Sequence, residues 1–126
     1  MAENRADEGF TLIELLVTIA IIAALAAIAI PTLIHQRQKA YMASMANDLH
    51  SAVVAEQAYG VNHSGFTTTV ADLEAEGYRN SSGVTPVHVV VNGNDFIACV
   101  KHAAASSWLV YDSTSATTTP SSSDCA

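Results

Sequence analysis

The chain has 126 residues and a net charge of −7, and half of its residues are hydrophobic. This length allows one modest domain with a small core. The acidic balance argues against nucleic acid as a charge-driven partner, because phosphate binding needs clustered Lys and Arg. The two cysteines, Cys99 and Cys125, require an oxidising compartment to pair, so they fit an exported domain.

Residues 1–8, MAENRADE, form a short leader that is acidic overall. A secretory signal peptide instead has a basic start, a short apolar centre and a small-residue cleavage site. The leader has Arg5 as its one basic residue, and the apolar run behind it is longer than an ordinary signal centre. We therefore expect no conventional removal of a signal peptide.

The apolar run from Gly9 to Pro31 organises the rest of the chain. No residue from Leu15 to Ile34 is charged. About 20 such residues, at ~1.5 Å of rise each, match the ~30 Å hydrocarbon core of a bilayer. Leu, Ala and Ile dominate the run, so it is expected to be a helix that lies in a membrane or among other helices.

Two residues stand out in this run. Glu14 lies about one turn inside the apolar boundary, and a carboxylate at the bilayer centre costs roughly 2.5–3.5 kcal/mol. Two interpretations of Glu14 remain open: it reaches the headgroups, or it neutralises a cation on a neighbouring chain. Pro31 removes the helical donor for the carbonyl of Ala27, so it is either a harmless boundary proline or a bend in the helix.

A second helical pattern over residues 35–60 follows the apolar run. Apolar side chains recur there at spacings of three or four and their multiples, which indicates an amphipathic helix with one apolar stripe. Gly60 is a natural end for it. The stripe consists of Ile34, Tyr41, Met45, Leu49, Val53 and Tyr59. The charged residues at the other positions are Arg37, Lys39, Asp48, His50 and Glu56.

Residues 61–126 are expected to form a small head on that stripe. Thr69 begins a short helix that Gly77 ends, and Asn92-Gly93-Asn94 indicates a hairpin. Pro86 places the first strand at an edge or next to a bulge. The expected strands are residues 84–91, 96–102 and 108–112. The fold class is therefore α+β: a long N-terminal helix packed against a small antiparallel sheet of about three strands.

The Ser/Thr-rich end of the chain, from residue 113 on, is interpreted as a solvated, mobile tail, with a glycan-carrying segment as the alternative. Cys125 lies near its end. On an exported head, a bridge from Cys125 to Cys99 is preferred to two free thiols. Such a bridge ties the tail to a strand and contributes ~3–4 kcal/mol on the chain-entropy model.

The sequence contains no recognisable group of catalytic residues. None of the five histidines forms an HExxH pair or joins a cysteine at zinc-finger spacing, and there is no GxSxG elbow or P-loop. The carboxylates at 72, 74 and 76 lack the regular oxygen spacing of an EF-hand and fit a solvated acidic face. The sequence therefore predicts no enzyme, no cofactor and no metal site.

The string Gly9-Phe10-Thr11-Leu12-Ile13-Glu14, the apolar run and Pro31 together resemble the N-terminus of type IV pilins and pseudopilins. The resemblance implies that residues 1–9 are a leader, that a prepilin peptidase cuts between Gly9 and Phe10, and that it methylates the new amine of Phe10. It also implies that Glu14 and Pro31 serve subunit assembly. Glu14 is expected to pair with the N-terminal amine of an adjacent subunit.

The resemblance implies a fold in which residues 10–34 are the membrane and assembly part of a long helix. It implies a single-pass membrane protein with its head outside the cytoplasm, and an extracellular pilus after assembly. The implied partners are other pilin subunits, the prepilin peptidase, the assembly platform, minor pilins and the membrane.

Two functions fit this resemblance. The first is a major pilin whose fibre serves adhesion, motility or DNA uptake. The second is a pseudopilin of a type II secretion or DNA-uptake system. The cysteine pair and the Ser/Thr-rich end favour the first.

The charge pattern departs from the family in two places. Pilin leaders usually carry Lys or Arg close to the glycine, whereas Asp7 and Glu8 stand there in this chain. Arg37 and Lys39 follow the apolar run, and the positive-inside rule assigns such residues to the cytoplasm, opposite to the family's topology. The cleavage motif is the more specific signal, so the head is expected outside.

Overall fold

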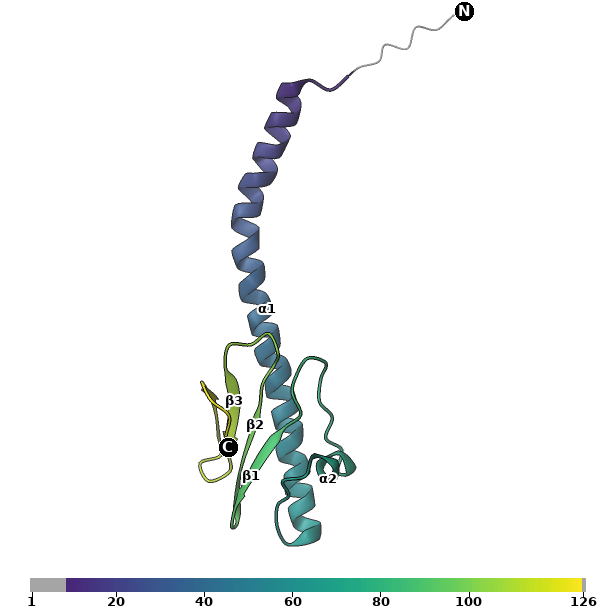
Figure 1. Cartoon of the computed structure of the whole chain (residues 1–126), viewed down its shortest axis with the longest axis vertical. Coiled ribbons are helices and arrows are strands. Elements are labelled where there is room, and N and C mark those ends of the chain that lie inside the picture. The colour runs from purple at the N-terminus through teal and green to yellow at the C-terminus, as the bar shows by residue number, and fades with distance from the viewer. Residues whose placement is uncertain (1–8, 126) are drawn as a thin grey trace, which may run out of the picture. The chain divides into compact units, whose positions relative to one another are not determined.

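A computed structural model of the chain describes residues 9–125. Residues 1–8 of the predicted leader lie outside the described part. The chain divides into two compact units, one that ends at Gln36 and one that begins at Arg37. Helix α1 (Leu12–His63) begins in the first unit and ends in the second (Figure 1).

The apolar part of α1 satisfies its hydroxyl groups internally. The Thr18 hydroxyl donates to the carbonyl of Leu15 at 2.8 Å, and the Thr32 hydroxyl donates to the carbonyl of Ala29 at 2.7 Å. Pro31 lies inside the helix, which continues through it. Back-bonding of this kind lets a hydroxyl sit in an apolar environment without a partner from another element.

The end of α1 differs from the predicted end near Gly60. The helix continues three residues further, to His63. Ser64 then adopts a left-handed conformation (φ 58°), and its N–H donates to the carbonyl of Gly60 at 3.1 Å. A Cβ at residue 60 would lie 3.1 Å from the Phe66 ring. Gly60 therefore makes room for Phe66 and does not end the helix.

The head contains a four-stranded antiparallel sheet in the order β1-β2-β3-β4 (Figure 1). The β1–β2 turn has Gly93 at its first central position with φ 63°, as a type II′ turn requires. The structure confirms the edge position that Pro86 predicted for the first strand: β1 is an outer strand of the sheet and begins after this proline. The strands are β1 (His88–Asn92), β2 (Asp95–Val100), β3 (Trp108–Asp112) and β4 (Thr117–Ser121).

Strand β4 corrects the prediction of a mobile tail. Thr117 pairs with Asp112, and Ser121 pairs with Trp108, so this part of the tail runs antiparallel along β3. Threonine suits a strand because its branched side chain fits the pleated surface. Pro120 is tolerated since β4 is the other outer strand of the sheet. Part of the Ser/Thr-rich segment is therefore an ordered strand and not a mobile tail.

The short helix α2 (Val70–Ala75) starts at Thr69 as expected, but the Thr69 side chain forms no capping bond. Thr67 replaces it: its hydroxyl accepts the N–H of Thr69 at 3.0 Å and donates to Asp72 at 2.8 Å. Gly77 follows α2 with φ 102°.

The core of the head lies between α1 and the sheet, and it confirms the α+β fold class. In Figure 1 the sheet lies along one side of the α1 segment that belongs to the head. Met45, Leu49 and Val53 of the predicted stripe are buried. They share one cluster with side chains from α2, the sheet and the loops, which are Leu73, Tyr78, Val84, Val87, Val89, Phe96, Ala98, Val100, Ala105 and Leu109.

Two acids on α1 contradict their predicted placement on the polar side. Asp48 and Glu56 are both fully buried. The carboxylate of Asp48 accepts hydrogen bonds from the N–H and the hydroxyl of Ser81, each at 2.6 Å. Glu56 Oε2 accepts the N–H of Thr67 at 3.1 Å. Both acids therefore fasten the segment between α1 and β1 to the helix.

The surroundings of Glu56 favour its neutral form. Its second oxygen, Oε1, is buried without a hydrogen-bond partner. Burial raises the pKa of Glu56, the N–H of Thr67 lowers it by a smaller amount, and the nearby charge of Asp72 raises it further. A carboxyl whose pKa is raised in the folded state stabilises the fold below its unfolded pKa and loses that contribution as the pH rises through the folded pKa.

Glu56→Gln is expected to stabilise the head relative to the unsubstituted chain increasingly as the pH rises from about 4 to 7. The reason is that glutamine stays neutral, whereas each unit by which the Glu56 pKa is raised removes about 1.4 kcal/mol at high pH. Denaturant unfolding of the full chain in detergent, followed by near-UV circular dichroism, measures the difference. The exposed Glu74→Gln is the control, and an equal pH trend in both variants contradicts the assignment.

Candidate functional site

The N-terminal motif adopts a defined geometry at the start of α1. Thr11 and Glu14 form a reciprocal capping box. Glu14 Oε2 accepts the Thr11 N–H and the Thr11 hydroxyl, both at 2.9 Å, and the Glu14 N–H donates back to the Thr11 hydroxyl at 3.3 Å. The spacing Thr-x-x-Glu is the sequence signal of this capping box, in addition to the two interpretations of Glu14 that remained open from the sequence. Glu14 thus has a local structural role at the helix start.

Gly9 and Phe10 precede this capping box in non-helical backbone. Phe10 is 91% exposed. A shallow hollow of about 370 Å³ is lined by Phe10, Glu14 and three side chains of the first helical turns, which are Ile13, Val17 and Thr18. The structure therefore brings three of the predicted site residues to one place, while Pro31 lies further along α1.

The apolar side chains of this unit surround the helix on every side. Each large apolar side chain from Phe10 to Ile34 is at least half exposed. A helix that is hydrophobic all round is stable only in lipid or among other helices. Among the described residues, α1 is also the helix that is long and apolar enough to cross a membrane. The first unit therefore presents a surface that another apolar phase must cover.

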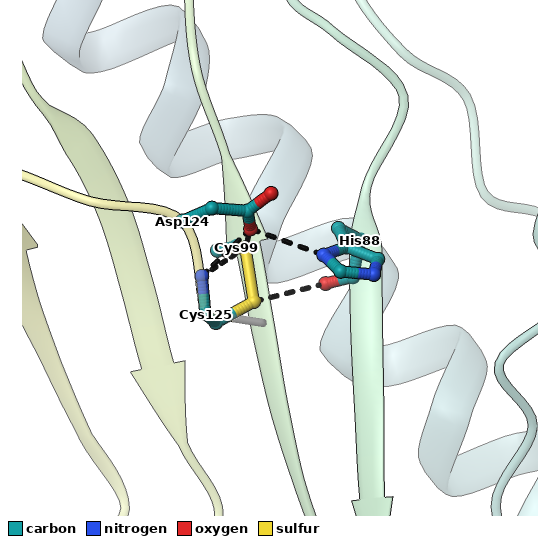
Figure 2. Close-up of side chains that lie close together, drawn as sticks. All are labelled: His88, Cys99, Asp124 and Cys125. Carbon is teal, nitrogen blue, oxygen red and sulfur yellow. Dashed lines mark hydrogen bonds and ion pairs between the residues drawn. A yellow bond between two sulfur atoms is a disulfide. The ribbon is translucent and has the colours of Figure 1, made fainter.

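A second cluster of reactive side chains lies in the head. Cys99 on β2 and Cys125 are joined in a disulfide with 6.0 Å between their Cα atoms (Figure 2). His88 Nδ1 and an oxygen of Asp124 are 3.0 Å apart beside it. The Cys125 N–H also donates to Asp124 at 2.6 Å. These contacts fasten the C-terminal residues over the first two strands.

The ligating atoms of His88, Cys99, Asp124 and Cys125 lie within 4.8 Å of one another. Thiolates are the strongest zinc ligands in such a set, and the disulfide uses both of them. His88 and Asp124 pair with each other. In the disulfide form, the cluster therefore acts as a clamp on the chain end and offers no thiolate to a metal.

The head also has a hollow of about 420 Å³ between the end of α1 and the β1–β2 turn. Its lining residues are Gln57, Gly60, Val61, Ser64, Gly65, Phe66, Gly93 and Asn94. None of them is titratable at neutral pH, and Ser64 has no base among them. This hollow therefore lacks the acid–base partners that catalysis requires.

Comparison with known proteins finds relatives that align over both units. The prokaryotic N-terminal methylation motif matches residues 4–30. The type IV wide pilus major component PilA4 of Thermus thermophilus is 32% identical over 129 aligned residues, which cover 96% of this chain and 98% of that protein. The chain belongs to the type IV pilin family.

Other relatives of this pilin-family chain match over shorter stretches. The competence protein ComGC of Bacillus subtilis is 32% identical over 92 residues, which cover 71% of the chain and 93% of that protein. A ComG operon protein 3 homolog of Bacillus licheniformis is 35% identical over 72 residues, which cover 57% of the chain and 74% of that protein. The match to PilA4 thus covers nearly all of the head, whereas the third match leaves almost half of the chain unaligned.

Cys125→Ser is expected to destabilise the pilin head by ~3 kcal/mol, because the bridge closes a loop of 26 residues. Thermal unfolding of the full chain in detergent measures the loss. Adding a reductant is expected to lower the midpoint of the unsubstituted chain to that of the variant and to leave the variant unchanged. Equal midpoints for both chains without reductant contradict a stabilising clamp.

Proposed function

We propose that this chain is a structural subunit, a major pilin, of a type IV pilus. The observation that carries the proposal is the near-complete match to a protein named as a major pilus component, which extends through the head. The exposed apolar side chains of the first unit support it, since a polymer of such helices covers them. The role in this proposal is structural, as it is for a protein named as a pilus component.

In this proposal the apolar helix has two environments. Before assembly it lies in the bacterial membrane with the head outside the cytoplasm, and after assembly it packs among sister helices in an extracellular fibre. The prepilin peptidase cuts after Gly9 and methylates Phe10. The assembly platform and minor pilins then direct polymerisation, in which Pro31 also takes part.

Glu14 supplies the electrostatic part of assembly. A carboxylate among packed apolar helices needs a cation, because an unpaired buried charge is strongly destabilising. The α-amine that cleavage creates has a pKa of about 7.7–8.0 and is largely protonated. The capping box engages Glu14 Oε2, and a carboxylate has lone pairs on both oxygens for further donors. Capping and pairing with a neighbour's amine are therefore compatible.

Gly9→Val is expected to leave the precursor uncut, since a branched side chain enters the peptidase cleft where glycine has none. Intact-mass spectrometry of membranes from the native host measures the ratio of precursor to mature chain. The matched control is Ala26→Val, which makes a comparable change inside the apolar run and is expected to be processed. A mature Gly9→Val chain that starts at Phe10 contradicts the cleavage assignment.

Glu14→Gln is expected to be cut and to enter the membrane, but to lower the fibre yield at least about tenfold, which corresponds to losing 1.4 kcal/mol or more per subunit contact. Glutamine keeps a capping acceptor and loses the charge. Thr11→Ala does the reverse: it removes the capping hydroxyl and keeps the carboxylate, so it is expected to assemble. Quantifying sheared fibres from both variants separates pairing from capping, and a normal yield from Glu14→Gln contradicts pairing.

The similarity to the competence protein ComGC favours a second candidate function, a pseudopilin of a DNA-uptake or type II secretion system. Electron microscopy of sheared surface material, with mass-spectrometric identification of the fibre protein, distinguishes the two. Long fibres made of this chain support the major pilin. An absence of fibres, together with a loss of secretion or DNA uptake on deletion, supports the pseudopilin.

A further inference from the structure

Three of the four Lys and Arg residues of the head lie at one end of it. Of the four Lys and Arg residues from residue 37 onward, Arg37 and Lys39 lie at the start of the head's part of α1, and Lys101 follows β2. The Gln38 side chain lies 3.5 Å from the carbonyl of Ala104, which brings the β2–β3 connection against this part of α1. We name Arg37, Lys39 and Lys101 the basic surface.

Two aromatic side chains accompany the basic surface. Tyr41 stacks on His102, with ring centroids 4.2 Å apart. The Lys101 ammonium lies 5.7 Å from the centre of the Trp108 ring. Both aromatic residues are partly exposed. Tyrosine and tryptophan next to lysine and arginine are the composition that proteins use at the boundary between lipid and water.

Four segments meet at this end of the head, because Val84 bridges to His102 and Ser121 at the end of β4 pairs with Trp108. Three of these segments, within residues 15–47, 80–94 and 97–111, contain no Asp or Glu. Asp95 and Asp112 lie at the β1–β2 and β3–β4 turns, which an antiparallel meander places at the opposite end from the β2–β3 connection. Asp124, which belongs to the clamp, pairs with His88. The basic surface therefore has no ion pair among the described residues, and its charge is available to an anionic partner.

Two cations of the basic surface, Arg37 and Lys39, follow the apolar run by only a few residues. Arg37 follows Ile34 by three residues and Lys39 follows it by five. At no more than about 3.6 Å per residue, their Cα atoms lie within about 11 Å and 18 Å of that of Ile34 however the backbone bends. The polar headgroup layer of a bilayer is about 5–7 Å thick on each side, and lysine and arginine side chains add several ångströms of reach. Within the helix α1 the rise is only about 1.5 Å per residue, so the Cα of Lys39 lies roughly 7.5 Å along the helix from that of Ile34. Both cations therefore reach the headgroups when the apolar run lies in a membrane.

We infer that the basic surface, with Tyr41 and Trp108, docks the head on anionic phospholipid headgroups of the outer leaflet while the subunit is stored in the membrane. This inference rests on the membrane-stored subunit proposed above. It also explains the departure from the positive-inside rule, since Arg37 and Lys39 then have a function outside the cytoplasm. Docking is reversible, because each cation near an anionic surface contributes only about a fivefold factor.

Trp108 is the single tryptophan of the chain and provides an internal probe. The full chain is reconstituted in vesicles of phosphatidylcholine alone or of phosphatidylcholine and phosphatidylglycerol in equal amounts. With phosphatidylglycerol, the Trp108 emission is expected to shift to shorter wavelength and to be quenched by a nitroxide lipid labelled at the headgroup. Both effects are expected to disappear in phosphatidylcholine and to weaken at high salt.

Arg37→Gln with Lys39→Gln is expected to reduce the docking equilibrium about 25-fold, which is two factors of five. These two residues are exposed on α1, whereas the cation over the Trp108 ring is that of Lys101. The charge-preserving pair Arg37→Lys with Lys39→Arg is the matched control and is expected to dock. Arg79→Gln, which removes a cation outside the basic surface, is expected to dock as well.

Alkaline carbonate extraction distinguishes failure of this inference from failure of the proposed function. If the chain stays in the vesicles but Trp108 emission is the same in both lipids, lipid docking is overturned and membrane storage stands. If the shift follows the protein-to-lipid ratio and not lipid charge, the surface binds a second copy, which also overturns lipid docking. If the chain is extracted, membrane storage fails, and this inference fails with it.

Discussion

The helix α1 must have an apolar environment over its first half, and this requirement governs the rest of the molecule. Its large apolar side chains are exposed on every side, while Thr18 and Thr32 bond within the helix and Glu14 bonds to Thr11. Since these polar groups are satisfied locally, moving the helix from lipid to a bundle of sister helices changes few hydrogen bonds. In the proposed assembly, an additional ion pair at Glu14 then favours the environment that supplies its cation.

The head uses a different kind of stabilisation from that of the apolar helix. Its core is small, as expected for a unit of this size, and polar attachments reinforce it. Asp48 and Glu56 bind the segment that returns from the end of α1 toward β1, and the disulfide holds the chain end. The head is thereby fixed to its own part of α1, so that a force or contact on the head is transmitted to the helix.

The sequence predicted the long helix, three of the strands and the family motif because each depends on local patterns. It did not predict β4, since a run of Ser and Thr has the composition of a disordered tail and becomes a strand only beside β3. Helical periodicity assigned Asp48 to solvent, because its partner Ser81 is 33 residues away and no local pattern records that contact. The Thr-x-x-Glu spacing in the sequence predicts the capping role of Glu14. The proposed pairing with the amine of a neighbouring subunit cannot be predicted in this way, because that amine belongs to a second chain.

The charges of the head are distributed unevenly between its two ends. The cations of the basic surface lie at the end of the head that holds the β2–β3 connection. The carboxylates of Asp95 and Asp112 lie at the opposite end, which holds the β1–β2 and β3–β4 turns. A charge rule that counts residues along the chain treats Arg37 and Lys39 as cytoplasmic. It does not register that the fold adds Lys101 and Trp108 to them, since those two residues lie more than 60 positions later in the chain. A surface assembled from such distant residues is a property of the folded head, and the topology rule, which acts on the unfolded chain during insertion, cannot evaluate it.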